Sequence, residues 1–330
     1  MQYRISMAPM EGLTGYIYRR AHHAYFAQLD AYYTPFISNK KLGNRERHDV
    51  MPEHNEGMHV IPQILTNRVD DFIEIEKQLY EYGYREVNLN LGCPSGTVTA
   101  KGRGAGFLAY PEELKQFLDK IYSKTSMTNM KISIKTRIGI SSEDEWPQLL
   151  AIFNQFPVEL LIIHPRLLKD FYKGYPHMGC YQYAKEHSLS PICYNGDIHS
   201  VDKWNEIKRN LGNTTKEIML GRGLLMNPAL AEEIVSVDDE DANENSGVEK
   251  EIDIIPSDRM KNFHDTILKG YCEEMSGDRN VLFKMKELWA YLGNGLQASP
   301  KLLKQIKKSN SVSEYKIATD AVFREYRERI

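Results

Sequence analysis

The sequence predicts an α/β fold, a (β/α)8 TIM barrel followed by a C-terminal all-helical domain. Eight strand-like apolar runs alternate with helical patterns over about 230 residues, which matches the number of strand–helix units and the usual length of such a barrel. Several runs are continuously apolar, as at residues 158–163, and such runs suit parallel strands buried on both faces. A doubly wound open sheet is the alternative, because periodicity alone does not close a barrel. The expected strands are residues 3–7, 31–37, 59–65, 86–91, 131–137, 158–164, 191–195 and 217–221.

Helix start signals lie between these strands. Pro111 is followed by two glutamates, so a proline in the first turn precedes acids that match the helix dipole. Residues 67–71 are mostly polar and precede an apolar helical pattern over 72–79. The alternation of strands and helices stops after Ala231, so we expect the barrel to end near this point.

The charge pattern divides the chain further. Residues 236–255 hold 8 acids and one lysine, and residues 256–330 carry a net charge of +4. We therefore expect a catalytic barrel domain over 1–235, a solvated acidic linker over 236–255 and a helical domain over 256–330. A mildly basic helical surface permits a polyanionic partner without demanding one. The helices expected in the last part are residues 258–275, 279–293, 299–308 and 311–329.

The composition excludes several classes of protein. Hydrophobic residues make up 42% of the 330, which supports a real core and excludes wholesale disorder. No apolar run reaches the length of a membrane span, and the N-terminus reads as a strand rather than a signal peptide. The four cysteines are widely spaced, which argues against a disulfide framework and a metal site. We expect a cytoplasmic protein without a metal, and a monomer, because no self-complementary apolar stripe is evident.

The segment from Val87 to Ser95 is the most informative stretch of the chain. A strand pattern ends at Asn90, and Cys93 follows in a Gly-Cys-Pro turn ahead of a glycine-rich loop at 101–106. Pro94 bars the cysteine from a helix interior, and Gly92 lets the chain turn sharply. A cysteine in an isolated Cys-Pro pair is more often a small buried hydrophobe. A thiol on a mobile loop at the carboxyl end of a strand is instead placed to do chemistry.

Polar side chains follow most of the other predicted strands too. Barrel enzymes place their function at the carboxyl ends of the strands. Burying so many polar groups without partners is expensive, so a polar ligand is the economical explanation. The residues at these ends are Pro9, Met10, Gln63, Asn90, Cys93, Lys135, Arg137, His164, Arg166, Asn195, Gly196, Asp197, Gly221 and Arg222.

Two of these ends indicate a phosphorylated ligand. The segments Asn-Gly-Asp at 195–197 and Gly-Arg-Gly at 221–223 each combine glycine with a charged residue. They follow the seventh and eighth predicted strands, where barrels usually bind phosphate. Arg222 alone could equally form a surface salt bridge. Lys135 could favour a reduced flavin ring or could point outward, and His164 could be a satisfied core histidine. Gln63 could bond a flavin ring or be merely a polar strand end.

Together these motifs resemble the tRNA-dihydrouridine synthase family, over nearly the whole chain and in the family's order. The resemblance implies FMN in the barrel, a helical domain that binds tRNA, and reduction of specific uridines to 5,6-dihydrouridine with NADPH or NADH as the reductant. Hydride would pass from the reduced flavin to carbon 6. The segments that carry the resemblance are residues 8–12, 90–95, 101–106, 135–139, 164–166, 195–198, 221–223 and 283–293.

The resemblance also implies roles for individual residues. Cys93 would give the proton to carbon 5, and Asn90, Arg166 and Lys101 would contact the substrate nucleotide. The residues implied to contact the flavin are Pro9, Met10, Gln63, Lys135 and His164. Those implied to hold its phosphate end are Asn195, Gly196, Asp197, Gly221 and Arg222.

The sequence departs from the family pattern at three places. Pro35 stands where many members have an acid, residues 164–167 read His-Pro-Arg-Leu instead of His-Gly-Arg-Thr, and the acidic segment 237–253 is extra. A barrel flavoenzyme that reduces a small molecule, similar to the dihydroorotate dehydrogenases, is one alternative, and a non-catalytic RNA-binding relative is another. The sequence does not decide which uridine is modified, which nicotinamide cofactor serves, or what the acidic segment does.

Overall fold

Nine parallel strands form a single sheet in the computed structural model, which describes residues 3–26, 29–125, 128–212, 215–241 and 256–329. The strands lie in the order β3-β2-β1-β9-β8-β7-β6-β5-β4. Their bounds are β1 Arg4–Met7, β2 Ala31–Tyr33, β3 Val60–Ile61, β4 Gln63–Ile64, β5 Glu86–Leu91, β6 Lys131–Thr136, β7 Leu161–Ile163, β8 Ile192–Asn195 and β9 Glu217–Leu220.

The sheet forms a barrel, because the strands at its two edges, β3 and β4, follow each other directly in the sequence. The predicted strand 59–65 is divided at Pro62, which has no N–H group to give to a sheet ladder. The first half, β3, pairs with β2 (Tyr32 opposite Val60), and the second half, β4, pairs with β5 (Gln63 opposite Asn88). The predicted barrel is therefore confirmed, and an open doubly wound sheet is excluded.

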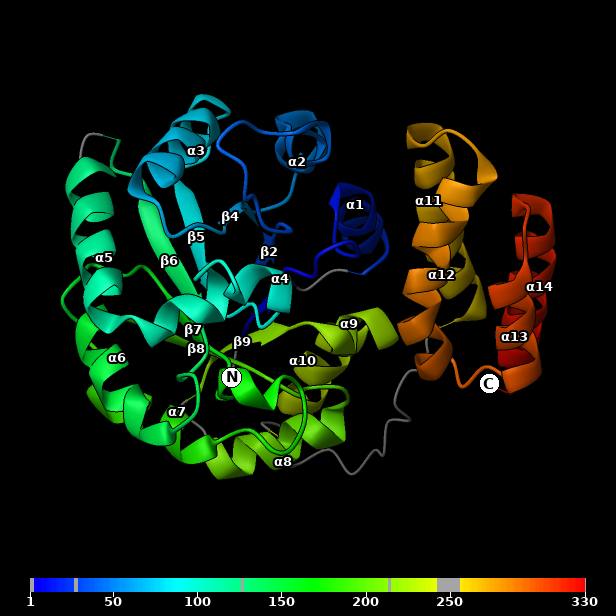
Figure 1. Ribbon diagram of the computed structural model, residues 1–330. Helices are drawn as coiled ribbons and strands as arrows, with labels where there is room; N and C mark the ends of the chain where they lie inside the picture. The colour runs from blue at the N-terminus through cyan, green and yellow to red at the C-terminus, as the bar shows by residue number, and fades with distance from the viewer. Residues whose placement is uncertain (1–2, 27–28, 126–127, 213–214, 242–255, 330) are drawn as a thin grey trace.

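Helices surround the barrel, and the C-terminal helices stand beside it (Figure 1). The helix predicted to begin at Pro111 does so, and the one predicted near 67–71 begins at Val69. The barrel helices are α1 Tyr16–Tyr25, α2 Asn44–Val50, α3 Val69–Glu81, α4 Gly96–Thr99, α5 Pro111–Thr125, α6 Trp146–Phe153, α7 Met178–His187, α8 Val201–Leu211, α9 Arg222–Met226 and α10 Leu230–Asp241.

The C-terminal helical region is confirmed, with helices close to their predicted bounds. They are α11 Ser257–Glu274, α12 Asp278–Gly295, α13 Pro300–Lys308 and α14 Val312–Arg327. Helix α10 runs to Asp241, so the predicted acidic linker is helical over its first residues. Helix propagation from the buried Leu230 and Ile234 costs little once the helix is nucleated. The rest of the predicted linker, 242–255, lies outside the described residues, and the division into domains stays a prediction.

The barrel interior changes in character along its axis. A small apolar cluster that includes Ala31, Ile61 and Cys193 lies near the end where the strands begin, and Glu86 and Glu217 line a cavity with it. Toward the carboxyl ends, Gln63, Asn88 and other polar side chains are fully buried instead. This change along the barrel axis positions the candidate site. Among the described residues, no helix is long and apolar enough to cross a membrane.

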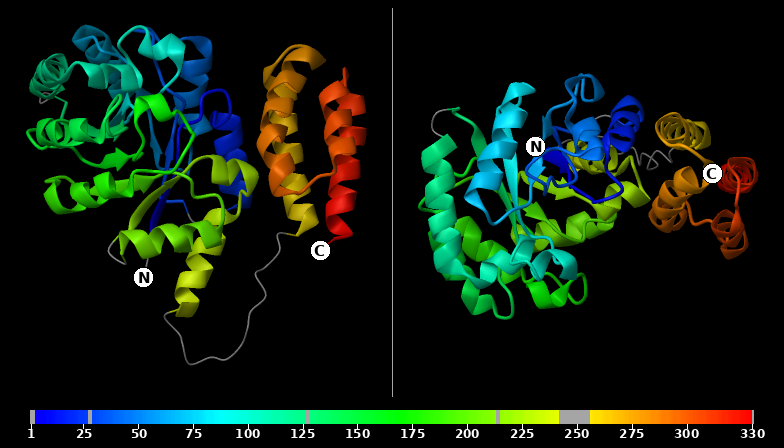
Figure 2. Two further views of the ribbon diagram at one scale, coloured as in Figure 1. Left: turned by 60° about the horizontal axis from the view of Figure 1, so that its bottom comes forward. Right: turned by 45° about the horizontal axis from the view of Figure 1, so that its top comes forward.

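The four C-terminal helices form a bundle that packs on α1 and α9 of the barrel (Figure 2). Two glycines allow this close approach. A Cβ atom on Gly270 of α11 would lie 2.8 Å from Ile17 Cγ2, and one on Gly295 of α12 would lie 1.7 Å from the Met226 carbonyl oxygen. Real Cβ atoms essentially never come this near to other heavy atoms, so the bundle is seated where glycine is required.

Replacing Gly295 with alanine should force α12 away from α9. We expect Gly295→Ala to lower the free energy of unfolding by about 1–3 kcal/mol, the usual cost of overpacking, as measured by denaturant unfolding. Gly179→Ala is the matched control, because this helical position in α7 meets nothing within 4 Å. It should stabilise the protein by up to about 1 kcal/mol. Equal stability of Gly295→Ala and the wild type would contradict the close approach.

Candidate active site

The carboxyl ends of β1, β6, β7, β8 and β9 surround one cavity at the polar end of the barrel. The structure thus brings together nine of the ten residues that the sequence predicted to hold a cofactor. Tyr172 and His199 also line the cavity, and the sequence analysis did not single them out. The predicted residues in its wall are Pro9, Met10, Lys135, His164, Asn195, Gly196, Asp197, Gly221 and Arg222.

The tenth residue, Gln63, belongs to a chain of amides inside the barrel. Asn88 and Asn90 lie two residues apart on β5, so both side chains lie on the same face of the strand. Asn90 Nδ2 donates to Gln63 Oε1 at 2.7 Å, and Gln63 Nε2 donates to Asn88 Oδ1 at 2.7 Å. Asn88 Nδ2 in turn donates to Ser133 Oγ at 3.1 Å. An amide nitrogen can only donate and an amide oxygen can only accept. This series of hydrogen bonds therefore fixes which way each side-chain amide is turned.

Asn90 also fixes the cysteine turn. Its Oδ1 accepts hydrogen bonds from the main-chain N–H groups of Gly92 (3.1 Å) and Cys93 (2.9 Å). The Cys93 carbonyl accepts from the Ala105 N–H at 3.0 Å, so the glycine-rich loop holds the other side of the residue. Gly104 has φ +56°, and a Cβ atom there would lie 2.8 Å from the Cys93 carbonyl oxygen. The sequence predicted a mobile loop, whereas this turn is anchored on both sides.

The Cys93 thiol is suited to hold a proton at neutral pH. The side chain is partly buried, and burial raises the pKa of the thiol above its ordinary value. Lys135 and Arg137 oppose this shift because their positive charge favours the thiolate, and burial outweighs them. A thiol that stays protonated can act as a general acid, and it is a poor nucleophile.

Positive charge is concentrated around the cavity. Burial lowers the pKa of His164 well below its ordinary value, and the charges of Lys135, Arg137, Arg166 and Arg222 lower it further. Burial, with a smaller effect of the Arg137 charge, lowers the pKa of Lys135 to about 8. Cations crowded in this way indicate a site for an anionic ligand, which would relieve their repulsion.

One carboxylate among these cations, Asp197, connects the two glycine-containing loops that the sequence predicted to bind phosphate. Asp197 accepts from Arg222 at 2.9 Å and also pairs with Arg166. The loops at 195–198 and 221–223 touch, because a Cβ atom on Gly223 would lie 2.2 Å from the Ile198 carbonyl oxygen. The two glycine segments that the sequence picked out separately therefore form one surface.

Two observations show that this surface leaves room for a ligand. His164 Nε2 is buried and has no hydrogen-bond partner among the described residues. Gly196, with φ +152°, lies against the His164 ring, and a Cβ atom there would come within 3.2 Å of it. A buried orphan nitrogen beside a glycine that admits no side chain fits a bound group with a hydrogen-bonding edge.

Arg166 is less available than the sequence suggested. Only 1% of its surface is exposed, and it donates to the main-chain carbonyls of Lys173 and Gly174 as well as to Asp197. Lys101 is exposed on the glycine-rich loop, where its carbonyl accepts from Asn67 Nδ2 at 3.0 Å, and it does not line the cavity. Among the predicted substrate contacts, the structure thus brings only Asn90 directly to Cys93.

Arg137, which the sequence placed at a strand end without giving it a role, is fully buried and connects the loops after β5 and β7. It donates to the carbonyls of Gly92 (3.1 Å), Leu167 (2.8 Å) and Phe171 (2.6 Å). Tyr172, by contrast, was missed by sequence reasoning. The Tyr172 ring lies 4.8 Å from the Arg222 guanidinium carbon. A usable signal was the Phe-Tyr-Lys-Gly-Tyr run at 171–175, since exposed aromatics after a barrel strand are unusual.

Comparisons with known proteins agree with this geometry. The sequence profile of the family described as Dihydrouridine synthase (Dus) matches residues 6–327. tRNA-dihydrouridine synthase B of Pasteurella multocida is 29% identical over 243 residues, covering 72% of this chain and 71% of that protein. A probable tRNA-dihydrouridine synthase of Staphylococcus aureus is 28% identical over 231 residues, covering 67% of this chain and 68% of that protein.

The fold is shared more widely. The solved structure of histamine dehydrogenase from Rhizobium sp. 4-9 superposes with a TM-score of 0.52 at 10% identity, over 80% of this chain and 49% of that one. At such low identity the likeness supports only the fold. The match over nearly the whole chain decides the question: this protein belongs to the dihydrouridine synthase family, a family of enzymes.

Proposed function

We propose that the protein binds FMN and uses NADPH, or NADH, to reduce specific uridines of tRNA to 5,6-dihydrouridine. The observation that carries the proposal is the placement of Cys93. Asn90 holds its main chain, burial raises the pKa of its thiol, and the positive charges of Lys135 and Arg137 act on it. The names of the relatives support the choice of tRNA as substrate. The cytoplasm as location and a monomeric state are part of the same proposal.

The cavity residues fit FMN. Arg222 and the main chain at 196–197 and 221 would hold its phosphate, because cations and glycine turns suit an oxyanion. His164, with its orphan Nε2, and Lys135 would face the ring edge, and Gln63 has a second amide hydrogen beyond its bond to Asn88. When bound, FMN supplies the hydride for carbon 6 of uracil.

The chain's own residues would complete the reaction. Asn90 Nδ2 gives one hydrogen to Gln63, which leaves its second hydrogen to bind a uracil carbonyl. Lys135, which lies opposite Asn90 across β5 and β6, would offset the negative charge that develops at the cofactor and on the base. The Cys93 Sγ–H bond would break as its proton passes to carbon 5 of the uracil ring.

Arg166 and Lys101 take indirect roles in this proposal. Arg166 positions Asp197 and the loop after β7, since its bonds go to protein groups. Lys101 is an exposed cation that would meet a tRNA phosphate. The helical region would supply further phosphate contacts, because its net charge is positive.

Replacing Cys93 tests the catalytic role. We expect Cys93→Ala to lower the rate of dihydrouridine formation by at least about 100-fold, the usual contribution of a general acid, while FMN and tRNA still bind. The measurement is mass spectrometry of tRNA nucleosides, position by position, in a deletion strain complemented with each variant. Buried Cys193, changed to alanine, is the control and should keep full activity per folded protein. Undiminished dihydrouridine in the Cys93→Ala strain would end the proton-donor role.

The pH dependence follows from the direction of the Cys93 shift. The acid must be protonated, and its pKa is raised, so loss of the Cys93 proton should lower the rate only above the ordinary thiol value of about 8.5. The negative charge of a bound, reduced flavin would raise the pKa of Lys135 from about 8, so this lysine should stay charged over the same range. Single-turnover reduction of tRNA by the pre-reduced enzyme measures this. A fall centred near pH 7 would contradict the assignment.

The phosphate role of Arg222 predicts a defect in cofactor binding. We expect Arg222→Gln to raise the dissociation constant of FMN by about 10- to 100-fold, because a charge-assisted bond is lost. Fluorescence titration of the apoprotein with FMN measures this change. Arg209→Gln on α8, where the exposed guanidinium bonds a carbonyl of its own helix, is the matched control. If the two variants bind FMN equally well, Arg222 does not hold it.

A further inference from the structure

A second cavity lies where the barrel meets the C-terminal helices. It has a volume of about 230 Å³ and is bounded by the loop after β1, by α1 and α2, and by the end of α11. The volume is below the range of about 300–1,000 Å³ that is usual for drug-sized ligands, so the space suits one planar ring. Neither the proposed flavin site nor the proposed uracil site uses this cavity.

The walls of this cavity offer hydrogen-bond acceptors and rings. Glu274 accepts from the Tyr16 hydroxyl at 2.9 Å and lies 2.6 Å from His48 Nδ1. Its two carboxylate oxygens together can accept about four hydrogen bonds, so capacity remains. The Tyr16 ring is held in place by stacking on His54, with ring centroids 4.1 Å apart. Asp49 adds a second carboxylate to the wall.

Cations lie at the cavity and beside it. Arg45 and Lys284 line it, and the exposed Lys40, Lys41 and Arg47 belong to the same segment as Arg45, residues 39–47 after β2. Arg45 pairs with the exposed Glu11. The acid in this stretch, Glu46, is 5% exposed and is occupied by the Gly43 N–H at 2.8 Å. Lys284 of α12 reaches across from the other side and donates to the Gly12 carbonyl at 3.0 Å. A wall that holds both carboxylates and cations fits a base in the cavity, with its phosphates near the cations.

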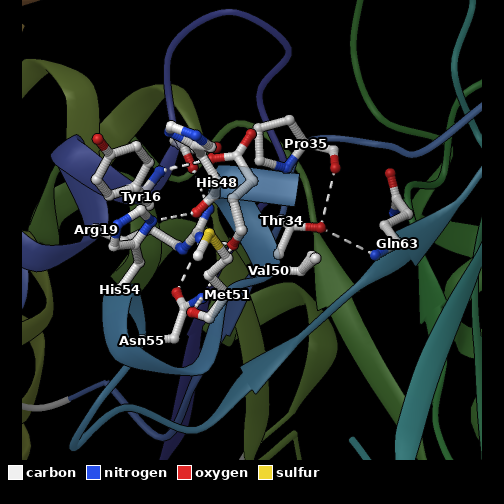
Figure 3. A network of polar contacts seen from close by, with 12 residues as sticks. Tyr16, Arg19, Thr34, Pro35, His48, Val50, Met51, His54, Asn55 and Gln63 are labelled. Atoms are coloured by element: carbon white, nitrogen blue, oxygen red, sulfur yellow. Dashed lines mark hydrogen bonds and ion pairs between the residues drawn. The ribbon is translucent and has the colours of Figure 1, made fainter. Parts of the chain in front are cut away.

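The cavity adjoins the candidate active site. Gly12 in its wall is two residues beyond Met10, which lines the other cavity. Pro35 in its wall follows Thr34, whose Oγ1 accepts from the Gln63 N–H at 3.1 Å (Figure 3). Pro35 therefore separates the second cavity from the amide chain that holds Asn90. A tRNA nucleotide bound there would lie close to the reduced uridine, either as a neighbour along the tRNA chain or through the folding of the tRNA.

We propose that this cavity receives a second, unstacked base of the same tRNA and so helps to select which uridine is reduced. The inference rests on the proposed function. Carboxylate acceptors favour a base with an exocyclic amino group, such as guanine, adenine or cytosine. Tyr16 and His48 provide the apolar ring walls, and the 39–47 segment with Lys284 meets the flanking phosphates.

Filling the cavity in the FMN-loaded enzyme tests this. Asn44 is exposed at the start of α2 and lines the cavity, so Asn44→Trp should block it without disturbing a core. We expect the kcat/KM for reduction of a tRNA transcript to fall at least about tenfold, mostly through KM, since a stacked base is lost. Asn210→Trp, an exposed asparagine near the end of α8, is the matched control. It should behave as wild type.

A series of transcripts with one abasic nucleotide each identifies the bound base. For the wild type, one abasic position should raise KM by about the same factor as Asn44→Trp. When Asn44→Trp acts on that abasic transcript, the increase in KM should be no larger than for either change alone, because both changes remove the same contact. Glu274→Gln, which keeps the size of the side chain, should reduce the preference for an amino-bearing base over uracil at that position. This second variant keeps the test decisive if Asn44→Trp folds poorly.

Other results would overturn the inference. They are an unchanged kcat/KM in folded Asn44→Trp, or additive effects of that variant and every abasic position. Slower flavin reduction by NADPH without tRNA, in this variant but not in Asn210→Trp, would assign the cavity to the nicotinamide dinucleotide instead. Failure of the proposed function looks different, because the wild-type enzyme would then form no dihydrouridine in any transcript.

Discussion

The side-chain amide of Asn90 is the contact on which the candidate site depends. Its oxygen holds the main chain of Gly92 and Cys93, and its nitrogen continues the amide chain through Gln63 to Asn88. All three amides are at least nine-tenths buried. Leaving one of them unpaired costs about 1–3 kcal/mol, more than a typical intact bond contributes. The arrangement is therefore nearly all-or-none, and the thiol cannot be repositioned without breaking the chain.

This amide chain also explains how the barrel interior can be polar toward the carboxyl ends of its strands. Near the end where the strands begin, an apolar cluster that includes Ala31, Ile61 and Cys193 lies beside the carboxyl groups of Glu86 and Glu217. At the other end the buried amides satisfy one another, so the interior can be polar without a bound ligand. The cavity beside it lacks this balance, since the charges of four cations act on His164, whose Nε2 has no hydrogen-bond partner among the described residues. The amide chain is therefore complete by itself, whereas the crowded cations of the cavity favour an anionic ligand.

Much of the fold could be read from the sequence because strand periodicity is a local property. The apolar runs predicted the position of each strand. The polar residues that follow these runs, such as Lys135 and Arg222, predicted the position of the cavity. Other features depend on contacts between distant segments. The pairing of Arg166 with Asp197 and the tie of Arg137 to the loop after β7 are tertiary contacts that no local pattern encodes. The division of strand 59–65 follows from Pro62, which was visible but not used.

The junction between the barrel and the C-terminal helices extends the same reasoning to the substrate. Gly270 and Gly295 let α11 and α12 approach the barrel closely. This packing brings Lys284 of α12 and Glu274 of α11 to the loop after β1 and to Tyr16, where they form hydrogen bonds. A modifying enzyme must choose one uridine among many chemically identical ones, and the fixed geometry around Cys93 is the same for each. Under the proposed function, the choice therefore has to be made outside the catalytic cavity, by surfaces such as the one that this junction forms next to it.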